Sequence, residues 1–207
     1  MWNLPNILTL LRIALIPILV TMFYLPWEWR YVACASIFGV AAVTDWLDGY
    51  LARKLDQFTP FGAFLDPVAD KLIVTAALIL LLQAHATALF ALPALVIISR
   101  EIVISALREW MAELGNRTSV AVSYVGKVKT TLQMIAIGVL LAVDPVAYPL
   151  WDQVGIFLLY IAAILTLWSM VIYLKAAWPE LSRVREKEEG NTLDPLEGPT
   201  EKSESTE

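Results

Sequence analysis

The chain has 207 residues, of which 58% are hydrophobic and 17% are charged, and its formal net charge is −5 at pH 7. This hydrophobic fraction is higher than that of an ordinary soluble domain, and the apolar residues come in long runs, so the composition indicates an integral membrane protein. The net negative charge belongs to residues 178–207, because residues 1–177 contain eleven acidic and eleven basic residues. No nucleic-acid partner is expected. The single cysteine, Cys34, excludes a disulfide within the chain.

Six apolar segments follow one another along the chain. A helix that crosses a bilayer core needs about 20 predominantly apolar residues, and the breaks between the segments are mostly rich in Pro, Gly or charge. We therefore predict an all-α integral membrane domain over residues 1–177 with six transmembrane helices. The Glu-rich tail, 178–207, cannot bury a core and is predicted to be disordered. The predicted spans are roughly 4–25, 31–54, 60–83, 87–110, 120–143 and 150–174.

Lysine and arginine are distributed asymmetrically around these segments. Within residues 1–177, ten of the eleven basic residues fall at or toward the side of the N-terminus, and only Arg30 lies in a loop on the opposite side. Because cytoplasmic loops carry an excess of Lys and Arg, we predict a multi-pass protein of the inner (plasma) membrane with both termini in the cytoplasm. His85 falls in a predicted outer loop and is expected to be an ordinary surface residue.

Four aspartates interrupt the second and third apolar segments near their cytoplasmic ends. Asp45 and Asp48 are three residues apart, and Asp66 and Asp70 are four apart, so each pair shares one face of its helix. A short loop joins the two segments, so we expect antiparallel neighbours whose acidic ends meet. Charges inside membrane spans are costly and usually mark function. Oxygen ligands suit Mg²⁺, Mn²⁺ or Ca²⁺, so the pattern predicts a polar metal-binding cavity at the cytoplasmic side.

Two other interpretations of the aspartates remain open from the residues alone. They could form the cation or proton site of a transporter, although they gather at one membrane face instead of forming a relay across it. They could also simply pair with neighbouring cations such as Arg53, Lys54 and Lys71.

The aspartates belong to a longer motif. It reads Asp45-x₂-Asp48-Gly49-x₂-Ala52-Arg53-x₈-Gly62-x₃-Asp66-x₃-Asp70. This pattern resembles the complete signature of the CDP-alcohol phosphotransferase family, and with the six-helix layout the resemblance covers about residues 1–177. In that family an alcohol attacks the β-phosphorus of a CDP-activated lipid and expels CMP. The resemblance implies a divalent-metal-dependent enzyme with two Mg²⁺ or Mn²⁺ ions bound by the four aspartates, and it also implies a homodimer.

The resemblance also implies roles for single residues. Asp70 is the expected general base for the acceptor hydroxyl as well as a metal ligand, and metal catalysis without a separate base is the alternative. Small residues beside the acids would let the cytidine ring approach the helix backbone, and close helix packing is the alternative. The residues expected to bind the CDP group are Asp48, Gly49, Ala52, Arg53 and Gly62, with Thr9 and Arg12 of the first segment.

Two basic segments, 99–110 and 126–130, resemble the branch of the family whose acceptor is sn-glycerol 3-phosphate, as do 6–12, 43–49 and 61–71. They imply CDP-diacylglycerol and glycerol 3-phosphate as substrates in the membrane. Arginine and lysine suit phosphate, so a phosphate site is expected, and a basic fringe facing lipid headgroups is the alternative. Serine and inositol phosphate remain alternative acceptors. The residues expected to bind the glycerol phosphate are Arg100, Arg108, Lys127 and Lys129.

Overall fold

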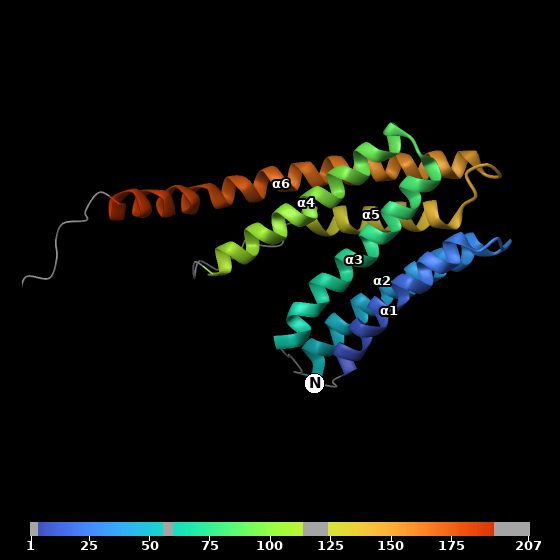
Figure 1. Ribbon diagram of the computed structural model, residues 1–207, viewed down its shortest axis with the longest axis horizontal. Coiled ribbons are helices and arrows are strands. Elements are labelled where there is room, and N and C mark those ends of the chain that lie inside the picture. Colours follow the sequence, from blue (N-terminus) through green and yellow to red (C-terminus); the bar gives the residue numbers. More distant parts are fainter. Residues whose placement is uncertain (1–3, 56–59, 114–123, 193–207) are drawn as a thin grey trace, which may run out of the picture.

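The computed structural model describes residues 4–55, 60–113 and 124–192 (Figure 1). Within these ranges all regular structure is helical, as predicted, and each predicted segment coincides with one helix. The helices are α1 (Leu4–Tyr24), α2 (Arg30–Leu55), α3 (Pro60–His85), α4 (Ala88–Glu113), α5 (Tyr124–Ala142) and α6 (Pro149–Thr192).

Four of the described helices contain stretches that are long and apolar enough to cross a membrane. They also expose large apolar side chains, such as Leu95 and Ile164, which are both 63% exposed, and such a surface is typical of contact with lipid. The apolar part of α5, Val128–Ala142, is shorter, and α3 is not among the four. The chain is thus a helical membrane protein. The four stretches are Asn6–Tyr24, Arg30–Asp48, Ala88–Met111 and Pro149–Lys175.

The helices pack as two groups around a common apolar core. Helix α1 packs along α2 and α3, whereas α6 packs along α5 and α4, and contacts between α2 and α5 join the groups. Figure 1 shows that the groups separate toward the end at which the N-terminus lies. Side chains from all six described helices meet in the core where the groups are joined. They include Leu19, Phe38, Ile73, Phe90, Ile137 and Leu159, all at most 2% exposed.

The short connection between α2 and α3 does not make these two helices pack extensively against each other. Direct contact between them is limited, and α1 packs extensively against both. Helices α2 and α3 are thus neighbours as expected, but among the described residues each contacts α1 more than the other. The mostly apolar α1 lies along both helices, and its residues reach both pairs of aspartates.

Helix α6 continues into the predicted tail. It runs without a break from Pro149 to Thr192, so residues 178–192 are helical and differ from the predicted disorder. This stretch contains four Glu and two Arg, which favour helix, and it extends an existing helix without a new nucleation step. Residues 193–207 of the tail lie outside the described residues.

His85 also differs from its expected surface position. Its side chain is 9% exposed, and its Nε2 lies 2.8 Å from the Asp152 carboxylate. The ring stacks on Phe90 with the ring centres 4.5 Å apart. The connection from α3 to α4 is only residues 86–87, so the start of α4 covers the last residue of α3.

Candidate active site

Both aspartates of α2 bind the same arginine of α1. Arg12 is completely buried, and its Nη1 lies 2.9 Å from the Asp45 carboxylate. Its other terminal nitrogen donates a hydrogen bond to Asp48, whose side chain is 5% exposed. Asp45 and Asp48 therefore lie on one face of α2, as their spacing predicts, and they share one guanidinium.

The aspartates of α3 lie near those of α2. Asp66 accepts a hydrogen bond of 2.5 Å from the Thr9 hydroxyl, so α1 contacts this pair as well. Asp45 and Asp66 are close enough to Asp48 for their charges to act on it, and the charge of Asp45 acts on Asp70. The four carboxylates thus occupy one electrostatic neighbourhood at the N-terminal end of α1.

The donor set fits a hard divalent cation in its chemistry, because it consists of carboxylate oxygens. Among the described side chains, however, no three of the His, Cys, Asp and Glu residues come together closely enough to enclose a metal ion. Arg12 and Thr9 bind three of the four carboxylates. The Arg12 guanidinium supplies positive charge where the acids would otherwise repel one another.

A cavity of about 240 Å³ lies beside Asp70 and between the two helix groups. Its walls combine apolar residues such as Ile97 with an unusually polar set for the interior of a membrane protein. The polar lining comes from α3, α4, α5 and α6 and consists of Asp70, Lys71, Thr75, Arg100, Glu101, Lys129, Thr130, Gln133 and Tyr173.

Two of the predicted phosphate-binding residues meet in this cavity at one carboxylate. Arg100 and Lys129 donate to the same oxygen of Glu101, at 3.0 Å and 2.6 Å. Arg100 also donates to Ser169 at 3.0 Å, and its guanidinium lies 5.6 Å from the centre of the Tyr173 ring. Arg100 and Lys129 are only 7% and 3% exposed. The cluster therefore holds two buried cations against one carboxylate, which leaves a positive charge suited to an anion.

Sequence reasoning did not assign a role to several residues of this cavity. Glu101 lies in the middle of an apolar helix and was detectable by the same criterion that singled out the aspartates. Lys71 donates to Ser105, so it connects α3 to α4. Gln133 is 4% exposed, and its side-chain oxygen has no hydrogen-bond partner within the described part of the chain. Gln133 is recognised as a cavity residue only from the packing of α5 against the cavity.

The remaining predicted site residues are only partly described. Gly62 is buried one turn before Asp66. The other five have side chains outside the described residues and lie in the last turns of α2, in α4 and at the start of α5. They are Gly49, Ala52, Arg53, Arg108 and Lys127.

Comparison with known proteins shows the family of this chain. The sequence pattern of the CDP-alcohol phosphatidyltransferase family matches residues 2–169. A curated relative from Pseudomonas fluorescens is 57% identical over 187 residues, which cover 90% of this chain and 95% of the relative. Relatives from Shigella flexneri serotype 5b and Escherichia coli K12 are 56% and 55% identical over 186 residues, which cover 87% of this chain and 97% of each relative. All three are named CDP-diacylglycerol–glycerol-3-phosphate 3-phosphatidyltransferase.

The long apolar helices are those of a membrane protein, and the family match makes it a membrane-bound transferase. The chain belongs to the CDP-alcohol phosphatidyltransferase family. It is an enzyme of phospholipid biosynthesis, and its family depends in general on divalent metal ions.

Proposed function

We propose that the chain transfers the phosphatidyl group of CDP-diacylglycerol to sn-glycerol 3-phosphate and releases CMP and phosphatidylglycerol phosphate. The observation that carries this proposal is that Asp70 lines one cavity together with Arg100 and Lys129. An acceptor with both a hydroxyl and a phosphate needs a base and a cation pair in the same space. The names of the relatives describe the same donor and acceptor.

The charge of the cavity favours a phosphorylated acceptor over serine. A phosphate monoester carries close to two negative charges at neutral pH, which match the charges of Arg100 and Lys129. Both cations are bound to Glu101, so this carboxylate competes with the phosphate for them. Arg108 and Lys127, which lie on the same two helices, complete the proposed phosphate site.

Asp70 is the proposed general base. It takes the proton of the acceptor hydroxyl, whose oxygen attacks the β-phosphorus while the bond to the departing CMP breaks. When bound by the four aspartates, two Mg²⁺ or Mn²⁺ ions would neutralise the diphosphate and the leaving group.

The CDP group is proposed to bind at the motif on α2 and α3. The expected contacts include Asp48, Gly49, Ala52, Arg53 and Gly62. Thr9 and Arg12 were also expected there, and their bonds to the aspartates add a second role. By binding Asp66, Asp45 and Asp48, they position the carboxylates.

The membrane arrangement remains part of the proposal. The distribution of Lys and Arg supports an inner-membrane protein with six spans and with both termini and the active site in the cytoplasm. Bacterial relatives of nearly the same length agree with this location. We infer that residues 1–177 form the catalytic membrane domain and that the enzyme works as a homodimer.

An acceptor panel tests this function directly. The full-length protein in detergent is given CDP-diacylglycerol, Mg²⁺ and one of glycerol 3-phosphate, serine or inositol phosphate, and CMP release is measured. We expect the fastest release with glycerol 3-phosphate and none after chelation, with recovery on adding Mg²⁺ or Mn²⁺. Faster release with serine would overturn the acceptor, and no release with any acceptor would overturn the reaction.

The cation pair provides a sharper version of the same test. Arg100→Gln and Lys129→Gln should raise the KM for glycerol 3-phosphate by roughly tenfold or more, because each removes a charge-assisted bond worth about 1.5–3 kcal/mol. Lys175→Gln is the matched control, since Lys175 is an exposed cation away from the cavity. An unchanged KM in both cavity variants would place the phosphate elsewhere.

A further inference from the structure

A second cavity of about 430 Å³ lies at the opposite end of the helices from the aspartates. The ends of α1 and α3, the start of α2 and the turn after α5 surround it. Its volume falls within the roughly 300–1,000 Å³ of small-ligand sites. The polar part of its lining consists of Tyr24, Arg30, Tyr31, Gln83, His85 and Asp144.

The lining of this outer cavity is divided between apolar and polar parts. Cys34, Leu81 and Leu140 are at most 2% exposed and form its apolar surface. The Tyr24 hydroxyl donates to the Gln83 side chain, so a hydroxyl and an amide lie together at the polar part. A cavity of this kind suits an amphiphilic ligand with a polar head.

Arg30 supplies the positive charge of the outer cavity. It is half-buried, donates to the Tyr31 hydroxyl at 2.6 Å, and lies 4.6 Å from the centre of the Tyr31 ring. Among the described residues no carboxylate forms an ion pair with it, in contrast to Arg12 and Arg100. A guanidinium without a carboxylate partner can bind a phosphate.

Two acids at this end of the helices have partners of their own. One Asp144 oxygen accepts backbone N–H bonds from Val146 at 2.9 Å and Ala147 at 3.4 Å, so this carboxylate caps the turn after α5. Asp152 is paired with His85. These bonds reduce the competition of both carboxylates for Arg30.

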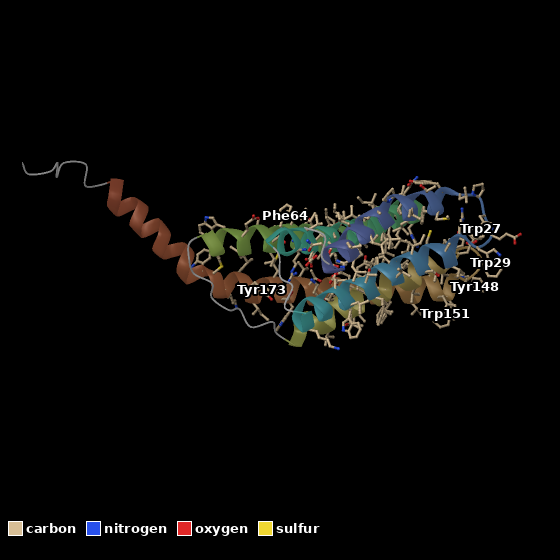
Figure 2. All side chains as sticks on the ribbon, turned by 90° about the horizontal axis from the view of Figure 1, so that it is seen from below. Trp27, Trp29, Phe64, Tyr148, Trp151 and Tyr173 are labelled. Atoms are coloured by element: carbon tan, nitrogen blue, oxygen red, sulfur yellow. The ribbon has the colours of Figure 1, made fainter. Side chains whose placement is uncertain are left out.

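Aromatic side chains place the outer cavity at the level of lipid headgroups. Figure 2 shows Trp27, Trp29, Tyr148 and Trp151 gathered at this end. They lie far from Tyr173, which lines the cavity beside Asp70, called the acceptor cavity from here on. These four side chains are 48–61% exposed, and exposed Trp and Tyr collect where the membrane meets water. The rule that cations avoid the outer side also makes Arg30 unusual, since it is the only basic residue of 1–177 expected there.

We propose that the outer cavity binds the headgroup phosphate of an anionic phospholipid, with Arg30 as its counter-ion. The single charge of a phosphodiester matches one guanidinium. The Tyr31 hydroxyl, which accepts from Arg30, and the side-chain N–H groups of Gln83, whose oxygen accepts from Tyr24, can donate hydrogen bonds to it. A lipid fits better than free phosphate, because the apolar surface of the cavity accommodates the glycerol ester region. The site is separate from the acceptor cavity and does not depend on the proposed reaction.

Thermal unfolding of the full-length protein in a neutral detergent tests the proposal. Short-chain phosphatidylglycerol, short-chain phosphatidylcholine and inorganic phosphate are each titrated into the wild type, Arg30→Gln and Lys175→Gln. We expect phosphatidylglycerol to raise the unfolding temperature most and to bind Arg30→Gln roughly tenfold more weakly. Lys175→Gln should behave as the wild type, and CMP release by Arg30→Gln checks that this variant folds.

The titrations of the wild type alone test the preference for an anionic lipid, even if Arg30→Gln does not fold. Equal stabilisation by the two lipids, or by inorganic phosphate and phosphatidylglycerol, would overturn a site for an anionic lipid. Arg30→Lys, which keeps the charge, should retain part of the preference for phosphatidylglycerol. Full retention in Arg30→Gln would show that Arg30 is not the counter-ion.

Discussion

Arg12 has the largest completely buried side chain among the described residues, although it carries a charge. Burial of a guanidinium is costly unless carboxylates pair with it, and Asp45 and Asp48 do so from α2. The same contact keeps two acids of the catalytic motif at a defined place. The stability of the protein and the position of these two acids therefore both depend on Arg12.

Replacing Arg12 tests this dependence. Arg12→Gln should lower the free energy of unfolding by about 3–5 kcal/mol, because Asp48 is left buried without its counter-ion. The half-exposed Asp45 contributes less, since water screens its charge. Thermal unfolding without divalent ions measures the loss, and Mg²⁺ should stabilise the variant more than the wild type. Arg12→Lys should fall between the two, and a variant as stable as the wild type would contradict the role.

Glu101 is the second residue whose charge can be tested. Glu101→Gln leaves Arg100 and Lys129 without their shared carboxylate, so we expect a lower unfolding temperature and a larger stabilisation by glycerol 3-phosphate than in the wild type. Titration of the acceptor during thermal unfolding measures both effects. If glycerol 3-phosphate stabilised both proteins equally, Glu101 would not compete with the phosphate. Glu101→Asp keeps the charge and serves as the control.

At the scale of helices, α5 and α6 depend on one glycine for their close packing. A Cβ atom at Gly155 of α6 would lie 2.7 Å and 2.8 Å from two side-chain carbons of Leu140 on α5, whereas one at Gly138 would meet no atom within 4 Å. Both glycines are helical, so Ala at either position gains helix propensity equally. The two positions thus form a matched pair for measuring the contact.

We expect Gly138→Ala to be neutral or stabilising by up to about 1 kcal/mol. Gly155→Ala should be less stable than Gly138→Ala by about 1–3 kcal/mol, because Leu140 has to move. Chemical unfolding in detergent measures this difference. Equal stability of the two variants would mean that Leu140 yields without cost.

At the scale of the whole molecule, the two cavities lie at opposite ends of the helices and are lined differently. The acceptor cavity contains three cations, Lys71, Arg100 and Lys129, whereas the outer cavity contains one arginine. This uneven distribution of positive charge agrees with the proposed cytoplasmic active site, because basic residues concentrate on the cytoplasmic side. Substrates with phosphate groups would then reach the acceptor cavity from the cytoplasm.

Cysteine labelling tests the orientation. In a Cys34→Ser background, Val146→Cys and Lys175→Cys place thiols at the two ends of the Pro149–Lys175 span, and both native positions are exposed. A membrane-impermeant thiol reagent added to spheroplasts should label position 146 at once and position 175 only after permeabilisation. The reverse order would invert the predicted topology.

The sequence by itself determined the helical class, the approximate ends of the six helices and the spacing of the aspartates. These features are local, since a run of apolar residues or a spacing of three or four residues acts within one helix. Even so, the helical stretch 178–192 was missed, because its charged composition suits a solvated helix as well as a disordered tail. The motif also predicted the family, which the comparisons confirmed.

Only the tertiary structure decided which distant residues meet. Arg12 contacts Asp48 across 36 positions and Thr9 contacts Asp66 across 57, so α1 contacts both aspartate pairs. Packing likewise brought Lys129 to Glu101 and His85 to Asp152. Such partners depend on how several helices bury their surfaces together, and no periodicity within a single helix encodes that arrangement.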